Sequence, residues 1–366
     1  MIGIIVAYIV LTIIIGLLAQ KTSNANAYEG FRLSLLMCVA VGAGEWMGGT
    51  STTGVSEYGY LYGISGAWYT IANGIGICFL AIFFARLFRS LNTSTVPEII
   101  GRYLGSKSRI IASVLLIIVL MIVGISQMIA VGTIGETLLK LNPAISIITL
   151  GFGVLIYTCV GGMSAIGATN VLHLIVMYVG ILAALILCVS SGVSVASGSN
   201  SLRETLPEYY FSPMSIGYGK VFSWIVASVL GACTAQAGLQ PILKAKDEKT
   251  AVKASCCIAL IVAPFGIFTA LLGMYAKAVY PDLANAKLAL PTLLMNMNPW
   301  ISGFVMAAIL AAVLSTASPI FLSCGTLITR DLYSGFNQDA DDKLLLKVSR
   351  LATFFVGVVC VILSVI

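Results

Sequence analysis

Long apolar runs without charged residues recur along the whole chain and are separated by shorter polar segments. A helix of about 20 apolar residues crosses a bilayer core of about 30 Å, whereas a membrane β-barrel needs short strands in which apolar and polar residues alternate. The pattern therefore predicts an all-α polytopic membrane protein. We expect ten spans, at residues 2–18, 33–53, 64–85, 111–138, 144–160, 164–190, 221–240, 254–277, 298–328 and 348–366.

The loops between these spans differ in charge on the two sides of the membrane. Of the 20 lysines and arginines, all but five fall in loops on one side, and the five exceptions are Lys140, Arg203, Lys220, Lys277 and Lys287. Basic residues accumulate in cytoplasmic loops, so we expect a multi-pass protein of the cell membrane with its N-terminus outside. The first run, Met1–Gln20, lacks a basic leading segment and a cleavage site, and we interpret it as a retained helix.

Composition agrees with this interpretation. Hydrophobic residues make up 59% of the chain and charged residues 9%, whereas about a quarter of the residues in soluble domains are charged. The net charge of +6 does not indicate nucleic-acid binding, because most of the basic residues lie in membrane-protein loops on one side. The expected surroundings are the lipid bilayer. The nine cysteines lie in apolar runs without CxxC spacing, and we interpret them as packing residues.

The stretch Ala307–Tyr333 carries hydroxyl groups and a proline inside an apolar helix. At about 100° per residue, one face collects Ala312, Ser315, Thr316, Pro319, Ser323 and Thr326. Pro319 has no N–H and crowds the carbonyl four residues earlier, so the carbonyl of Ser315 leaves the helical ladder beside two hydroxyls. Uncharged oxygens at one depth suit a hard cation, although small and hydroxyl residues also let membrane helices pack closely.

Glycines crowd the second span around an acidic residue. Glu45 and Trp46 lie among four glycines, which are Gly42, Gly44, Gly48 and Gly49. Dense glycine weakens a helix and permits an unwound turn, and an ionisable group at membrane depth is by default a functional candidate. The alternative for Glu45 is a protonated or hydrogen-bonded structural role.

The seventh span is interrupted in a similar way by small and polar residues, which are Gly231, Gln236, Gly238, Gln240 and Pro241. Two interrupted spans, five apart and therefore opposite in orientation, indicate an inverted repeat with a binding site near the membrane midplane. We expect one transmembrane domain over residues 1–366, with a leading helix at 1–20 and five-helix repeats at 33–193 and 219–366. The second repeat is expected to be incomplete, because an eleventh span is missing from this chain.

Three groups of residues carry a family resemblance. The segment Gly161–His173 is similar to the pattern GG-x-x-A-V-x-x-T-D-x-x-Q, the LST run at 314–316 leads to Thr329–Tyr333, and Gln240 is followed by Ala245 and Lys246. Together they resemble the sodium:solute symporter family, whose members have a leucine-transporter-like fold. The resemblance covers essentially the whole chain.

The resemblance implies a sodium ion, Na+, as coupling ion between the second span and the hydroxyl-bearing helix. The implied ligands are the carbonyls of Val39, Gly42 and Ala312 and the hydroxyls of Ser315 and Thr316. A small polar solute would lie beside the ion. The residues implied for this solute are Glu45, Trp46, Ser228, Gly231 and Gln236.

The chain departs from the family pattern at three places. Asn170 stands where Asp is usual, so no second sodium site of that kind is expected. His173, the only histidine, replaces Gln, and packing against neighbouring helices is favoured over proton transfer for it. Ser318 and Pro319 replace Asp-Ser, which removes a charge near the ion.

These observations predict a secondary active transporter, in which sodium-coupled symport of a small polar organic solute proceeds by alternating access. They do not predict an enzyme, because the serines lack Asp and His partners and no paired carboxylates lie in the spans. One alternative is coupling to protons through Glu45 or His173, and another is a symporter-like sensory domain of a signalling protein. The fold does not choose among solutes.

Overall fold

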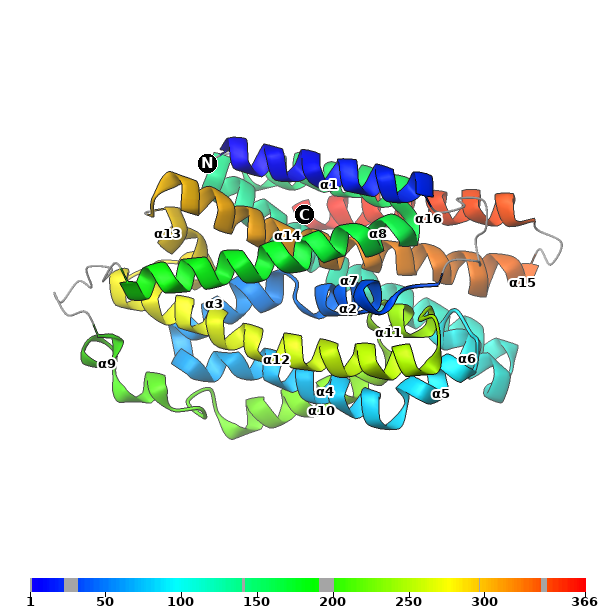
Figure 1. Ribbon diagram of the computed structural model, residues 1–366, viewed down its shortest axis with the longest axis horizontal. Coiled ribbons are helices and arrows are strands. Elements are labelled where there is room, and N and C mark those ends of the chain that lie inside the picture. Colours follow the sequence, from blue (N-terminus) through cyan, green and yellow to red (C-terminus); the bar gives the residue numbers. More distant parts are fainter. Residues whose placement is uncertain (1, 23–31, 140–141, 191–200, 296, 337–340) are drawn as a thin grey trace.

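Most described residues of the chain lie in helices (Figure 1). The computed structural model describes the chain except residues 1, 23–31, 140–141, 191–200, 296 and 337–340, and within the described part the β pairing consists of one bridge between Leu33 and Ala245. The expected all-α architecture is confirmed. The long helices run side by side along the longest dimension of the molecule, as apolar helices that cross a membrane do.

The elements have the following bounds. They are α1 Ile2–Thr22, α2 Leu35–Trp46, η1 Thr50–Gly54, α3 Val55–Tyr62, η2 Gly63–Ala67, α4 Trp68–Phe83, α5 Ala85–Ser90, α6 Val96–Leu104, α7 Ser106–Leu139, α8 Pro143–Ser190, α9 Leu202–Thr205, η3 Glu208–Phe211, α10 Tyr218–Thr234, α11 Gln236–Leu243, α12 Glu248–Val279, η4 Ala286–Leu288, α13 Ala289–Met295, α14 Pro299–Leu327, η5 Ile328–Tyr333, α15 Ser334–Phe336 and α16 Asp342–Val365.

The predicted spans all coincide with helical segments, and a multi-pass membrane protein is confirmed. Within the described residues, six helical stretches are long and apolar enough to cross a membrane, or seven if α10 and α11 count as one bent span. Three predicted spans fall on shorter apolar helices, which are Gly3–Ala19, Leu35–Trp46 and Pro143–Ile156.

Two predicted boundaries differ from the structure. The second span was expected to end at residue 53, but the chain becomes helical again after its break and α3 ends only at Tyr62. The fifth and sixth predicted spans lie within α8, where Gly162 adopts φ 61° and ψ −172° and produces a kink. A positive φ is readily available to glycine, so the chain changes direction there without a loop.

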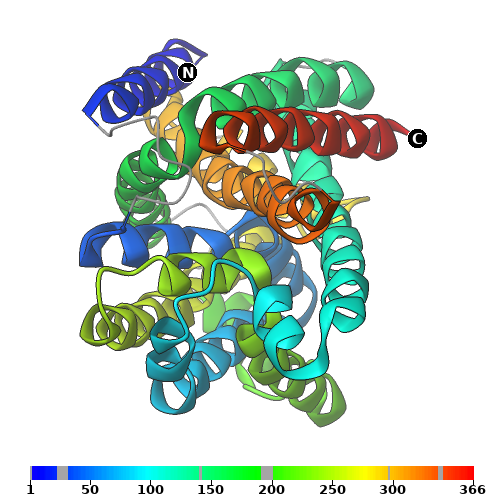
Figure 2. The same ribbon diagram turned by 90° about the vertical axis from the view of Figure 1, so that its right-hand side faces the viewer.

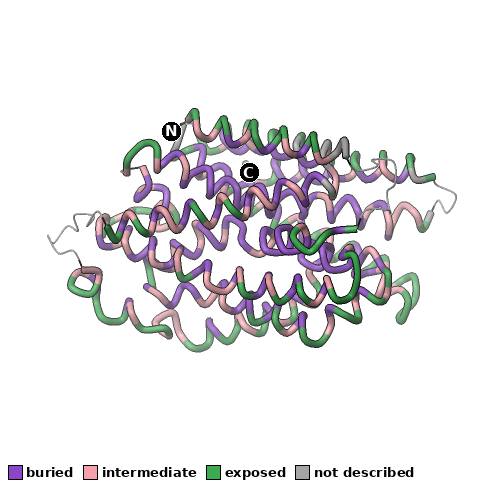
Figure 3. The backbone as a smooth tube through the Cα atoms, in the orientation of Figure 1, coloured by how far each residue is buried: buried purple, intermediate pink, exposed green. Residues whose placement is uncertain are grey.

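Helix α14 lies at the centre of the molecule. In the most apolar 18-residue window of Pro299–Tyr333, 94% of the residues are buried, against 28% in Ser106–Glu136 and 33% in Lys343–Val365. Figure 2 shows the orange ribbon of α14 among the other helices, and Figure 3 shows it buried along most of its length. It contacts α7, α8, α16 and α2. The hydroxyls of α14 therefore face protein on nearly every side.

Two spans are interrupted at the places that the sequence indicated. Helix α2 ends at Trp46, Met47 and Gly48 are not helical, and a π-helical turn, η1, leads into α3. Helices α10 and α11 meet at an angle of 47° across Ala235, which has extended backbone angles. The interruptions are confirmed, while the inverted repeat that they indicate stays a prediction.

Candidate functional site

Two hydroxyls of α14 contact the last turn of α2. The hydroxyl of Thr316 donates to the carbonyl of Gly44 at 2.6 Å, and the hydroxyl of Ser315 lies 3.3 Å from the same oxygen. Both hydroxyls are also within hydrogen-bond distance of the Ala312 carbonyl, at 3.1 Å for Thr316 and 2.9 Å for Ser315. Four uncharged oxygens thus gather where a buried helix meets an interrupted one.

Glycine makes this close approach possible. A Cβ atom built on Gly44 would lie 2.9 Å from the Cβ of Ser315, and one built on Gly48 would lie 2.5 Å from Oγ1 of Thr316. Real Cβ atoms essentially never approach heavy atoms this closely. The glycines that weaken α2 therefore also let its backbone reach the hydroxyls of α14.

The structure brings together three of the five expected sodium ligands, Ala312, Ser315 and Thr316. The hydrogen bonds of the described residues join neither the Val39 nor the Gly42 carbonyl to these hydroxyls. A Cβ atom on Gly42 would meet Ile258 and Pro241, so the α-carbon of Gly42 faces α12 and α11. The carbonyl that the two hydroxyls contact is that of Gly44. The ligand set stays a prediction.

The donor set fits a hard monovalent cation better than a transition metal. Hydroxyl and carbonyl oxygens are neutral, hard ligands, and none of them must lose a proton to bind. In the part of the chain that the structure describes, no three His, Cys, Asp or Glu side chains are grouped to hold a metal ion.

Glu45 and Trp46 lie at the break itself. Oε2 of Glu45 is buried and has no hydrogen-bond partner among the described residues. The indole of Trp46 packs against Gly238 of α11, where a built Cβ would be 3.0 Å from the indole nitrogen. The Trp46 carbonyl accepts a hydrogen bond from the Ser51 hydroxyl at 2.7 Å, which joins the two sides of the break. Of the expected solute residues, Glu45 retains a free acceptor.

The other expected solute residues lie in different surroundings. The Ser228 hydroxyl donates to Oδ1 of Asn73 on α4 at 2.8 Å, and Gly231 has open space beside it. Oε1 of Gln236 accepts from the N–H of Val96 at 2.7 Å, and its Nε2 donates to the Ser94 carbonyl at 3.3 Å. Ser228 and Gln236 therefore already bind neighbouring elements.

Sequence reasoning missed Gln127. Its Oε1 accepts from the N–H of Gly49 at 3.0 Å and lies 3.0 Å from a Cβ built on Gly48, so α7 supports the interrupted segment. Gln127 is an amide inside the apolar span 111–138, and this was the available signal, because polar side chains in membrane helices usually contact other helices.

The residues that depart from the family pattern contact other helices. Nδ2 of Asn170 donates to the Ser315 carbonyl at 3.2 Å, and the hydroxyl of Thr158 bonds Ser318 at 3.2 Å. His173 forms a hydrogen bond through Nδ1 with the hydroxyl of Tyr8 on the leading helix α1. The expected packing role of His173 is supported by this contact between helices.

Gln240 joins helix α11 to the C-terminal half of α14. The Ser323 hydroxyl donates to Oε1 of Gln240 at 2.6 Å, and Nε2 of Gln240 donates to Oγ1 of Thr326 at 3.3 Å. At the end of α11, the ammonium of Lys244 contacts the Ser94 hydroxyl at 3.2 Å. Burial lowers the pKa of Lys244 below its ordinary value, with the charges of two nearby arginines as a smaller cause.

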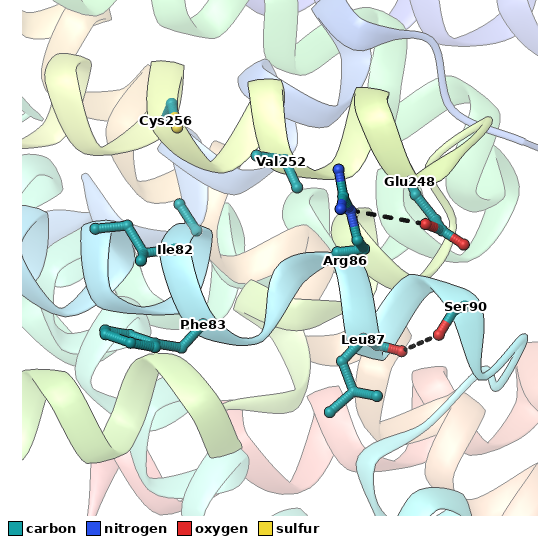
Figure 4. Close-up of a pocket in the computed structure, with 9 residues that line it drawn as sticks. Ile82, Phe83, Arg86, Leu87, Ser90, Glu248, Val252 and Cys256 are labelled. Atoms are coloured by element: carbon teal, nitrogen blue, oxygen red, sulfur yellow. Dashed lines mark hydrogen bonds and ion pairs between the residues drawn. The ribbon is translucent and has the colours of Figure 1, made fainter.

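A separate hollow of about 680 Å³ lies between α4, α5 and α12 (Figure 4). Arg86 and Glu248 face each other across it with 3.9 Å between Nε and Oε2, and Ile82 and Phe83 line its apolar end. It shares no residue with the oxygens around Ser315. The Arg86 side chain is 75% exposed and that of Glu248 48% exposed, so their pairing contributes little to stability.

Comparison with solved structures identifies the fold. A Na+-coupled sialic acid symporter in a substrate-bound, outward-open state superposes with a TM-score of 0.83 at 16% identity, over 99% of this chain and 81% of that one. A nucleobase-cation-symport-1 family transporter in a closed conformation gives 0.61 at 14% identity, over 91% of this chain and 74% of that one. The leucine-transporter-like fold expected from the resemblance is confirmed.

Relatives and a family model identify the lineage. The chain is 24% identical over 357 residues to the high affinity choline transporter 1 of Homo sapiens, covering 93% of this chain and 61% of the relative. It is 27% identical over 334 residues to a sodium/glucose cotransporter of Vibrio parahaemolyticus, covering 82% and 61%. The chain thus spans about three fifths of the length of these relatives, which are transporters and not enzymes. The model of the sodium:solute symporter family matches residues 30–366, and the chain belongs to that family.

Proposed function

We propose that this chain is the transport domain of a sodium-coupled symporter for a small polar organic solute. One observation carries the proposal: the Ser315 and Thr316 hydroxyls of a buried helix contact the Gly44 carbonyl at the end of an interrupted one. Family membership supports sodium as the coupled ion. The solute and the ion are cargo, and no covalent step is needed to move them.

In this proposal, sodium arriving from outside binds the oxygens of Ala312, Ser315 and Thr316 together with carbonyls of α2. Gly44 joins Val39 and Gly42 as a proposed carbonyl ligand. Since α2 is interrupted directly after these carbonyls, ion binding orders the segment that follows. A solute that contacts the ordered segment binds the sodium-loaded state more tightly, and this difference in affinity is the coupling.

Transport then requires that the two interrupted spans move relative to the helices around α14, so that the site opens to the other side. The proposal includes the inverted repeats at 33–193 and 219–366. It also includes a cell-membrane location with the N-terminus outside, which the charge difference between the loops supports.

The proposed solute has O–H or N–H donors. Glu45 supports this choice, because its buried Oε2 has no hydrogen-bond partner in the described part of the chain and lies beside the proposed ion site. Trp46 offers an aromatic face next to it. Relatives and structural neighbours named for choline, glucose and sialic acid show how widely solutes vary on this fold, so the class is proposed from Glu45 and not from them.

The test is uptake of a panel of labelled solutes into proteoliposomes, with sodium and proton gradients imposed separately. The panel contains a sugar, a polyol, a quaternary amine, an amino acid and a carboxylate. We expect a sodium gradient to accelerate uptake of at least one uncharged or cationic member. Uptake driven by a pH gradient without sodium would contradict sodium coupling and support the proton alternative.

A further inference from the structure

The peptide carbonyl of Ser315 receives a hydrogen bond from another helix. Within α14 the N–H of residue 319 would normally donate to this carbonyl, but Pro319 has no N–H. Nδ2 of Asn170, on α8, donates to the carbonyl at 3.2 Å. Asn170 and Ser315 are both fully buried, so water does not supply this bond. The amide replaces the hydrogen bond that the proline cannot make.

The same amide lies against the candidate sodium site. A Cβ atom built on Gly44 would lie 3.1 Å from Nδ2 of Asn170 and 3.2 Å from Oγ of Ser315, so the three residues converge. An ionised aspartate, the usual residue of the family pattern, has no hydrogen to donate to a carbonyl. An amide at position 170 can therefore donate the hydrogen bond that a proline at position 319 cannot donate to the Ser315 carbonyl, whereas an ionised carboxylate cannot donate it.

We propose that Asn170 positions the sodium site by holding the Ser315 carbonyl that Pro319 leaves free, so that two departures from the family pattern form one functional pair. This inference rests on the proposed sodium coupling. Asn170 thereby fixes the Ser315 carbonyl, and with it the residue whose hydroxyl is a proposed ligand of the ion. Asn170 acts through Ser315 and is a positioning residue for the ion.

The test is a double-mutant cycle with Asn170→Ala and Pro319→Ala. It measures the sodium concentration that gives half of the maximal thermal stabilisation of the purified protein, and the same concentration for solute uptake. In the wild-type background Asn170→Ala leaves a buried carbonyl without its donor, and we expect the half-saturating sodium concentration to rise roughly tenfold. In the Pro319→Ala background the helix supplies an N–H, and the rise should fall below about twofold.

The outcomes separate clearly. Equal effects of Asn170→Ala in the two backgrounds, or no effect in the wild type, would overturn the pairing. If Asn170→Ala does not yield folded protein, recovery of the double variant supports the pairing and loss of both overturns it. Asn73→Ala is the matched control, because it removes a buried amide on α4 whose partner is Ser228, and its effect should not depend on Pro319.

The same measurements distinguish this inference from the proposed function. A wild-type protein whose stability and uptake do not respond to sodium would contradict sodium coupling itself. A normal sodium response combined with an additive cycle would contradict only the pairing of Asn170 with Pro319.

Discussion

The two interrupted spans differ in what their polar groups contact. At the break after α2, Oε2 of Glu45 has no hydrogen-bond partner among the described residues, and one carbonyl, that of Gly44, is shared by two hydroxyls. Beyond the break at Ala235, the amides of Gln236 and Gln240 each make two hydrogen bonds to other elements. The first break retains groups that can bind a ligand, whereas the second joins α11 to its neighbours.

This difference shows that an interrupted membrane helix is not by itself a binding site. Both breaks expose backbone groups that need partners, as any interrupted membrane helix does. At α11 the partners are backbone groups of Ser94 and Val96 and hydroxyls of α14. At α2 the neighbours bring hydroxyls and a carbonyl, which are groups that a cation can bind together.

The largest expected effect comes from removing the hydroxyls at the first break. Ser315→Ala combined with Thr316→Ala deletes two of the four oxygens that gather here, leaving the carbonyls of Gly44 and Ala312. We expect sodium-stimulated uptake to be abolished while the protein still inserts and folds. Proteoliposome uptake at several sodium concentrations measures this. Ser318→Ala is the matched control, since it removes a buried hydroxyl of the same helix that bonds Thr158 instead. Normal transport by the double variant would disprove the ion site.

A comparison of two glycines tests the crowding at the first break. Gly48→Ala would place a Cβ 2.5 Å from Oγ1 of Thr316 and 3.0 Å from Oε1 of Gln127, so these groups must move apart. Overpacking of this kind costs about 1–3 kcal/mol, and we expect the half-saturating sodium concentration to rise about tenfold or more. Gly231→Ala enters open space and should change that concentration by less than about twofold. Similar effects of the two variants would remove the distinction between the breaks.

Glu45→Gln separates solute binding from ion binding. The substitution keeps the shape of the side chain and replaces one carboxyl oxygen, which can accept a hydrogen bond, with an amide nitrogen, which can only donate, and a buried group left without its partner costs about 1–3 kcal/mol. We expect the KM for a solute with O–H or N–H donors to rise roughly tenfold, while the sodium concentration for half activation changes little. Glu57→Gln, on α3, is the control with no expected effect. An unchanged KM would remove Glu45 from the proposed solute site.

Much of the candidate site could be predicted because the pattern of residues indicates how deep in the membrane a side chain lies and on which face of its helix. The 3.6-residue period placed Ser315 and Thr316 on one side of α14, and glycine density located the break near Glu45. The period does not say which group a buried amide will contact. From the sequence, Gln236 could equally be a solute ligand or form hydrogen bonds with backbone groups. Only the fold places the N–H of Val96 beside it. Gln127 was missed for the same reason.

The limits of the family pattern are physical as well. The family pattern implied the carbonyls of Val39 and Gly42 as ligands, which stays a prediction, and it did not indicate the Gly44 carbonyl, which Ser315 and Thr316 contact in the last turn of α2. Which carbonyl of a last helical turn faces a neighbour depends on the residue at which the helix ends, and sequence patterns do not determine helix ends to that accuracy.

The smallest expected effect comes from the second break. Gln240→Leu removes the bonds from Gln240 to Ser323 and Thr326, and each such bond contributes about 1 kcal/mol. We expect the backbone amides of α11 to exchange hydrogen several-fold faster, measured by mass spectrometry, while exchange in α2 stays unchanged. Thr234→Val is the control, because its hydroxyl bonds only the Leu230 carbonyl among the described residues, within its own helix. Faster exchange in α2 as well would mean that the two breaks share one set of stabilising contacts, and that Gln240 also supports the ion site.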